Sequence, residues 1–105
     1  SVASRGLGDV YKRQVSGAIA DNAAGFAAMT LMDREKEPLT IEFKINFLNI
    51  ADGEKLVAEA EILQAGRSIF HGESKVYTIK KREKILTATA LVTIKATSKV
   101  SEKLS

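Results

Sequence analysis

The sequence predicts an α+β domain in which one helix is followed by four antiparallel strands. Small and apolar residues recur at three- and four-residue spacing from about Ser16 to Met32, which is typical of a helix. Beyond Pro38 the apolar residues recur at every second position, which is typical of strands. Short turns separate four such segments, so we expect neighbouring segments to pair antiparallel.

The composition excludes several classes of protein. The chain has 105 residues, enough for one domain, with 45% hydrophobic and 28% charged residues, as in soluble globular proteins. A net charge of +3 spread along the chain, with 6% aromatic residues, does not favour a nucleic-acid surface. With no cysteine there is no disulfide or thiolate site. No apolar run reaches the roughly 18 residues of a membrane span. We expect a cytoplasmic protein without a cofactor, a metal, a nucleic-acid partner or a membrane partner.

The predicted helix is apolar on all sides. Gly17 and Gly25 each lower its intrinsic propensity by roughly 1 kcal/mol relative to Ala, so we expect another backbone or a ligand to come close there, packing relief being the alternative. Charged residues and Pro38 end the helix by Asp33. Two adjacent rows follow helical spacing: Ala18, Asn22, Gly25, Met29 and Met32 in one, and Ile19, Ala23, Phe26 and Thr30 in the other.

Asp21 is the only charged residue between Val15 and Met32. A carboxylate in such apolar surroundings is costly unless it is paired, hydrogen-bonded or used in chemistry. Asp21 is therefore the leading candidate for a catalytic residue, and a capped or salt-bridged structural role is the alternative.

The strand segments follow at short intervals. The first alternates apolar Leu39, Ile41, Phe43, Ile45 and Phe47 with polar residues and ends at a turn at Asp52 and Gly53. The second runs from about Lys55 to Ala65, where Leu56, Ala58, Ala60 and Ile62 alternate with polar residues. The others run from about Ser68 to Ile79 and, after a turn from Lys80 to Glu83, from Ile85 to Ala96. The helix has to lie across the concave face of this sheet, and edge-to-edge dimerisation would cover its open edges.

The chain divides into three parts. Residues 1–14 show neither helical nor strand periodicity and look like a tail, or like sequence foreign to the domain. Residues 15–96 form the domain, and residues 97–105 form a polar C-terminal tail.

The segment SGAIADNAAGFAAMTLM, followed by LTIEFKINFLNIADGEKLVAEAEILQAGRSIFHGESKVY, resembles the hotdog fold and, within it, the phenylacetate-degradation type of acyl-CoA thioesterase. This resemblance implies an antiparallel sheet wrapped around one long central helix. It also implies a homodimer or dimer of dimers, with active sites at the subunit boundary and an acyl-CoA ester as substrate. Asp21 then acts as general base or nucleophile toward the thioester.

The same resemblance implies an oxyanion site of backbone amides at the helix start, in a His-x-Gly segment nine to seven residues before the Asp. Lys12, Arg13 and Gln14 occupy those positions here. The family also has a strand and a helical segment before the signature. We therefore hypothesise that the natural N-terminus is missing or replaced up to about Gln14.

The remaining candidates have ordinary structural alternatives. Asn22 orients a water or the thioester, or holds a strand by its amide. Thr40 faces the partner's active site by resemblance, or is simply a strand former. The turn of Gly66, Arg67 and Ser68 approaches the pantetheine or phosphates of CoA by resemblance, although a solvated turn explains Arg67 equally.

Two functions fit these residues, with hydrolysis the leading one, and a third is disfavoured. The first is hydrolysis of a small, medium-chain or aromatic acyl-CoA to the free acid and CoA. The second is a non-catalytic acyl-CoA binding module or subunit, favoured by the missing His-x-Gly. The third, dehydratase chemistry, needs a histidine beside the acid, and we interpret the sole histidine, His71, as a sheet residue.

Overall fold

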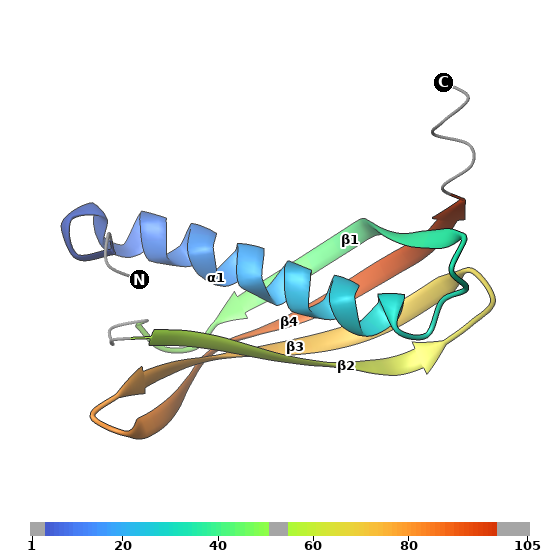
Figure 1. Ribbon diagram of the computed structural model, residues 1–105. Coiled ribbons are helices and arrows are strands. Elements are labelled where there is room, and N and C mark those ends of the chain that lie inside the picture. Colours follow the sequence, from blue (N-terminus) through green and yellow to red (C-terminus); the bar gives the residue numbers. More distant parts are fainter. Residues whose placement is uncertain (1–3, 51–54, 99–105) are drawn as a thin grey trace.

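One long helix lies across one face of a four-stranded antiparallel sheet (Figure 1). The computed structural model describes residues 4–50 and 55–98, with side chains from Lys12 onward. Its elements are helix α1 (Ser4–Met29) and strands β1 (Lys36–Phe47), β2 (Lys55–Ala65), β3 (Ile69–Lys80) and β4 (Glu83–Ser98). This architecture confirms the predicted α+β class and is that of the hotdog fold.

The strand order is β1-β4-β3-β2, so β1 and β2 form the two edges of the sheet. The expectation that all consecutive strands pair is therefore wrong for β1 and β2, whereas β2 with β3 and β3 with β4 are antiparallel neighbours as predicted. After Phe47 the chain stays on β4, because the amides of Leu48 and Asn49 donate to the carbonyl of Thr87 at 2.9 and 3.3 Å. The turn predicted at Asp52 and Gly53 lies outside the described residues.

Helix α1 begins and ends earlier than its apolar pattern indicates. It starts at Ser4, so residues 4–14, which show no apolar periodicity, have helical backbone. Leu, Lys, Arg and Gln in this segment are good helix formers, and such residues need no amphipathic pattern to be helical. The helix ends at Met29, where Leu31 and Met32 donate to carbonyls three residues back and tighten the last turn.

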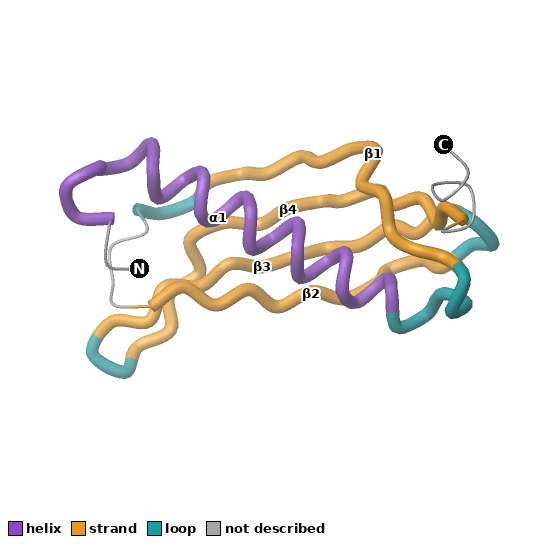
Figure 2. Tube along the Cα trace, turned by 45° about the horizontal axis from the view of Figure 1, so that its top comes forward, coloured by secondary structure: helices purple, strands orange, loops and turns teal. Residues whose placement is uncertain are grey.

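The face of α1 that packs on the sheet belongs to neither of the two predicted rows. A third row, one helical turn apart at each step, is fully buried and consists of Ser16, Ala20, Ala24 and Ala28. These small side chains let the backbones come close, since a Cβ added at Gly72 of β3 would lie 3.8 Å from the Cβ of Ala24. Figure 2 shows the helix running obliquely over the sheet.

The core lies between this helix face and the middle of the sheet. Alternate residues of β3 and β4 point toward the helix and are buried, while partly buried residues of β1 and β2 close its sides. The inward residues of β2 are those predicted from its alternation, and the bounds of β2 are also as predicted. The buried apolar residues are Ala20, Ala24, Ala28, Phe70, Val76, Ala88, Ala90, Val92, Ile94 and Ala96.

A β-bulge in β1 changes which residues face the helix. Thr40 pairs with Ile94 and Glu42 pairs with Thr93, so Ile41 is an extra residue in the ladder. Before the bulge the even-numbered residues face inward, and after it the odd-numbered residues do, because a bulge reverses the side-chain alternation. The prediction of one continuous apolar face is therefore correct for Phe43 and wrong for Ile41, which is 52% exposed.

The tight turn between β3 and β4 is where the sequence predicts it. Lys80 pairs with Glu83, and the two residues between them, Lys81 and Arg82, have φ angles of 49° and 69°. Positive φ at both central positions is the geometry of a type I′ hairpin turn, whose twist matches that of the strands.

Within the described residues, no helix has both the length and the apolar character that a membrane crossing requires.

Candidate functional site

The bulge in β1 brings two predicted site residues into direct contact. The hydroxyl of Thr40 donates a hydrogen bond of 2.7 Å to Oδ1 of Asp21 on the helix. Thr40 lies immediately before the bulge, on the inward side, so its side chain points at the helix and not at solvent. Because the other carboxylate oxygen of Asp21 bonds to none of the described residues, it is available to a ligand or a water molecule.

Four of the predicted site residues line one depression between α1 and β1. This depression has a volume of about 660 Å³. Asp21 and Gly25 are one turn apart on the helix, and Asn22 lies beside Asp21 on the same side. The complete lining is Asp21, Asn22, Ala23, Gly25, Phe26, Met29, Pro38 and Thr40.

Apolar residues form most of the remaining wall. Phe26 is 67% exposed and Met29 is 41% exposed, so neither side chain belongs to the core of the single chain. They lie outside the core because the sheet covers only the face of α1 that carries Ala20, Ala24 and Ala28. Their position can be found from the sequence by counting from Asn22, because residues 22, 26 and 29 are spaced by four and three and therefore share one side of a helix.

Asp21 is less enclosed than the sequence predicts. In the single chain its side chain is half-buried, at the rim of the fold. The expectation that apolar surroundings enclose Asp21 is therefore only partly correct for the single chain, because one sheet contacts only one stripe of a helix. Phe26 and Met29, which are exposed, line the same depression, so part of its wall is open to solvent.

Gly25 has space in front of it. A Cβ built at Gly25 meets no atom within 4 Å among the described residues, and a Cβ at Gly17 lies 3.9 Å from Cε2 of Phe43. Packing within the chain therefore requires glycine at neither position. At Gly25 the free space belongs to the depression that contains Asp21.

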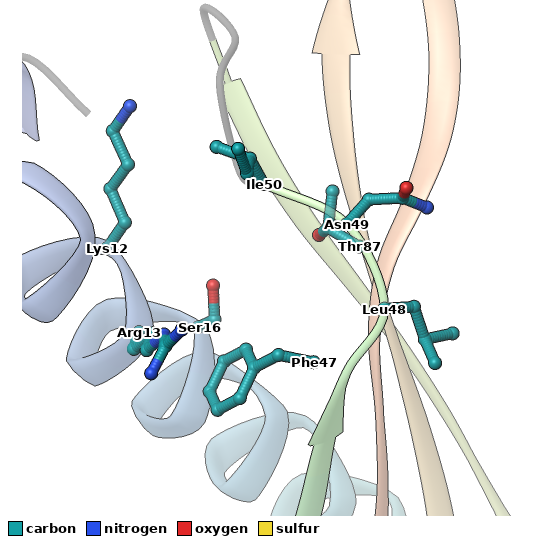
Figure 3. A pocket seen from close by; sticks show the side chains of 8 residues that line it. All are labelled: Lys12, Arg13, Ser16, Phe47, Leu48, Asn49, Ile50 and Thr87. Carbon is teal, nitrogen blue, oxygen red and sulfur yellow. The ribbon is translucent and has the colours of Figure 1, made fainter.

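A second depression of about 240 Å³ lies nearer the start of α1. Lys12, Arg13 and Ser16 contribute to it from the helix, Phe47 and Thr87 contribute from the sheet, and residues 48–50 contribute from the segment that follows β1. Figure 3 shows the ring of Phe47 beside Arg13, whose guanidinium carbon lies 5.4 Å from the ring centroid. This depression shares no lining residue with the one that contains Asp21.

The positions at which the resemblance implies a His-x-Gly segment lie in the interior of α1. Because the helix begins at Ser4, the residues at positions 12–14 are well past its first turn. Only the first four amides of a helix lack an intrahelical acceptor. Backbone amides at Lys12, Arg13 and Gln14 are therefore not the free donors of a helix start, which is what the resemblance implies for an oxyanion site.

The turn between β2 and β3 stands apart from Asp21. Gly66 and Arg67 line a separate, smaller depression with the loop that follows α1, and the carbonyl of Ser68 accepts a hydrogen bond from the amide of Ala96. The structure explains why glycine occupies position 66, since a Cβ there would lie 2.9 Å from the carbonyl oxygen of Ile69. A role for these residues in CoA binding stays a prediction.

His71 lies on the sheet face that points away from the helix. It is exposed, its neighbour Gly72 packs under Ala24, and its Nδ1 is 3.5 Å from the hydroxyl of Thr93. The sheet therefore separates His71 from Asp21 within the chain, which disfavours a histidine and acid pair of the dehydratase kind. The described residues hold no group of three or more His, Asp or Glu side chains suited to a metal ion.

Solved structures with this architecture include several thioesterases. A thioesterase family protein from Silicibacter pomeroyi is 35% identical over 81% of this chain and 62% of its own, with a TM-score of 0.79. A protein from Bacillus halodurans, determined with CoA, is 21% identical over 80% of this chain and 57% of its own, with a TM-score of 0.75. A mutant thioesterase from Staphylococcus aureus is 26% identical over 78% of this chain and 68% of its own, with a TM-score of 0.64.

The chain spans less than two thirds of the first two of these proteins. No curated protein matches it. The thioesterase superfamily profile matches residues 15–85, a segment that contains α1 from Val15, the bulge in β1 and the whole Asp21 depression. On this match, the chain belongs to the thioesterase superfamily.

Proposed function

We propose that this protein hydrolyses acyl-CoA thioesters, with Asp21 as the catalytic carboxylate, and that it is a thioesterase of the phenylacetate-degradation type. The observation that carries the proposal is the Asp21 carboxylate, held by Thr40 at the rim of an apolar depression. Membership of the thioesterase superfamily supports the reaction type. The CoA in the Bacillus halodurans structure, a fold relative, supports a CoA ester as ligand.

The hydrogen bond from Thr40 gives the two oxygens of the Asp21 carboxylate different roles. Oδ1 accepts the bond, which fixes the orientation of the group, and in this proposal the second oxygen of Asp21, a lining residue of the depression, acts on the substrate. As general base, the free oxygen takes a proton from water while the water oxygen bonds to the acyl carbon. The tetrahedral intermediate then expels the sulfur, which takes the proton back, so the products are the carboxylic acid and CoA thiol.

Direct attack by Asp21 is the second form of the same proposal. The carboxylate oxygen then bonds to the acyl carbon, CoA leaves, and water hydrolyses the mixed anhydride. Labelled water separates the two routes. Repeated turnover in ¹⁸O-water labels the Asp21 carboxylate when water attacks the aspartyl carbonyl of the anhydride, whereas the general-base route leaves it unlabelled.

Asn22 is the proposed donor to the oxyanion. Its side chain lines the same depression as Asp21, and an asparagine amide can stabilise the negative oxygen of a tetrahedral intermediate. This assignment follows from the position of residues 12–14 in the helix interior, where their backbone amides are not available.

We propose a homodimer or a dimer of dimers with the site at the subunit boundary. Arg13 and Asp21 are eight residues apart on one helix, about 12 Å along its axis, and they line different depressions. Side chains around Arg13 therefore cannot reach the same carbonyl as Asp21 within one chain, but a symmetry-related copy can supply them. The exposed apolar side chains beside Asp21, and the open edge of β1, provide a surface for that contact.

The wall of the depression favours a small, medium-chain or aromatic acyl group. Phe26, Met29 and Pro38 give an apolar surface, and Phe26 offers a ring face to an aromatic acyl group. Arg67, together with Gly66 and Ser68, is the proposed contact to the pantetheine or phosphates of CoA, since a guanidinium suits phosphate geometry. The cytoplasm is the expected location, in keeping with a CoA ester as substrate.

One observation favours a second function, a subunit that binds acyl-CoA without turnover. It is again the interior position of residues 12–14 in α1, which removes the backbone donors that the family resemblance implies. In that case Asp21 and Thr40 would contact the bound thioester without activating water.

A combined assay distinguishes the two functions. Thiol release is measured for acetyl-, hexanoyl-, phenylacetyl- and palmitoyl-CoA, and binding of non-hydrolysable thioether analogues of the same esters is measured by calorimetry. We expect release to be fastest with hexanoyl- or phenylacetyl-CoA. Tight binding without release would establish the binding subunit, and neither binding nor release would exclude both functions.

A further inference from the structure

A second hydrogen bond joins the sheet to the helix, one residue away from Asp21. The hydroxyl of Ser74, on β3, donates to the backbone carbonyl of Ala20 at 2.7 Å. Both residues are fully buried, so the bond is shielded from water. It ends on the peptide group that links Ala20 to Asp21, and it therefore fixes the backbone from which the Asp21 side chain projects.

The surroundings of Ser74 make this contact possible. Its neighbours across the sheet are Ala60 on β2 and Ala90 on β4, and Gly72 lies two residues earlier on the same face. These small residues leave room for the helix backbone to approach the sheet at this level. A carbonyl oxygen has two lone pairs, so Ala20 can accept from Ser74 while keeping its intrahelical bond.

Packing alone defines the axial position of the helix weakly here. The helix face that meets the sheet presents alanines, whose short side chains form shallow ridges that interlock little with the sheet. A displacement along the axis would change the contacts of these methyl groups slightly, but it would move the Ala20 carbonyl away from its position opposite the Ser74 hydroxyl and so bend or lengthen the 2.7 Å bond. The directional bond of Ser74 is therefore the contact that resists sliding at this point.

We infer that Ser74 is a positioning residue for the Asp21 carboxylate. Ser74 on the central strand β3 holds the helix backbone at Ala20, and Thr40 on the edge strand β1 holds the carboxylate at the next residue. Loss of the first bond lets the helix move, and the second bond lengthens as a result. The kinetic part of this inference rests on the proposed hydrolysis, whereas its structural part does not.

The test compares Ser74→Ala with Thr78→Val, a matched control. Thr78 also lies on β3, is 1% exposed, and donates its hydroxyl to Thr87 on β4, not to the helix. The first readout is the ¹³C chemical shift of the Asp21 carboxyl carbon, with Thr40→Val as the reference for a broken Thr40 bond. We expect the shift in Ser74→Ala to move from the wild-type value toward that reference, and the shift in Thr78→Val to stay at the wild-type value.

The second readout is kinetic. In Ser74→Ala we expect kcat to fall on the order of 10-fold with KM changed less than about twofold, within the roughly 100-fold that a 1 Å misplacement can cost. A wild-type carboxyl shift in Ser74→Ala, or equal kinetic losses in Ser74→Ala and Thr78→Val, would overturn the inference.

Two further results are informative. If the wild type releases no thiol, hydrolysis fails as a proposal, and the carboxyl shift still decides the role of Ser74. If Ser74→Ala does not fold, Ser74→Cys takes its place, because cysteine has a similar size but is a much weaker donor than serine, so the bond to Ala20 is weakened. An Asp21 shift between the wild-type and Thr40→Val values would then support the inference, and an unchanged shift would overturn it.

Discussion

Two sides of helix α1 differ in burial and in the chemistry of their side chains. The side of α1 facing the sheet carries Ala20, Ala24 and Ala28, all fully buried, while the adjacent side carries Asp21 and Phe26 at an open depression. The first side packs against the sheet of the same chain. The second has polar chemistry and exposed apolar surface that this chain leaves uncovered. The comparison separates residues that specify the fold from residues that are free to serve a ligand or a second subunit.

The largest expected effect comes from enlarging a residue on the sheet-facing side. Ala24→Leu forces a longer side chain against Gly72, so we expect the free energy of unfolding to fall by about 3 kcal/mol, at the upper end for overpacked cores. Ala18→Leu, at an exposed position of the same helix, should change it by less than about 0.5 kcal/mol. Denaturant titration measures both, and similar values for the two variants would remove the distinction between the two sides.

On the open side we expect a loss of association and not of folding. Phe26→Gln removes an aromatic side chain that is 67% exposed in the single chain, so the unfolding of that chain should change little. If a second subunit buries Phe26, the dimer dissociation constant should rise by about 30-fold, equivalent to roughly 2 kcal/mol for a buried aromatic contact. Analytical ultracentrifugation measures this constant, and an unaltered dimer would place the subunit contact elsewhere.

Removing the Thr40 hydroxyl tests the polar part of the open side. Thr40→Val keeps the shape of the side chain and removes the donor to Asp21, so we expect kcat for thiol release to fall by about 10-fold, the cost of roughly 1.4 kcal/mol for one charge-assisted bond. Thr93→Val is the control, because Thr93 lies on the outward face of β4. Equal kcat values in the two variants would show that the Thr40 bond does not assist the reaction.

The smallest expected effect separates stability from activity at two glycines. Gly17→Ala and Gly25→Ala should each raise the free energy of unfolding by up to about 1 kcal/mol, because alanine has the higher helix propensity and neither added Cβ meets a close contact. Only Gly25 faces the Asp21 depression, so only Gly25→Ala should reduce thiol release. A Gly25→Ala variant that is more stable and fully active would remove the reason for glycine at that position.

Local patterns in the sequence predict much of this fold. The alternation from Lys55 to Ala65 gives the bounds and inward face of β2 correctly, because period-two patterning depends only on neighbouring residues. The turn at Lys81 and Arg82 is likewise local. The pairing of β1 with β4 is not predictable in this way, since it depends on contacts between distant parts of the chain.

The sequence identifies candidate residues for the site, but it does not predict how they are arranged. Asp21 stands out in the sequence as a lone charge, but its hydrogen bond to Thr40 depends on a bulge at Ile41 that strand alternation does not indicate. The buried face of α1 is also hidden, because nearly every row of this helix consists of small or apolar residues and periodicity cannot choose among them. Ser74 carries no sequence signal, since a serine in a strand has no distinguishing pattern.

The central claim is that the Asp21 carboxylate cleaves the thioester, and Asp21→Asn tests it most directly. Asparagine preserves the size of the side chain and can still accept the bond from Thr40, but it has almost no basicity. With the fold verified by an unchanged melting transition, we predict that thiol release from the best acyl-CoA falls by about 100-fold or more, the range for loss of a general base. Release at the wild-type rate by folded Asp21→Asn would contradict the claim.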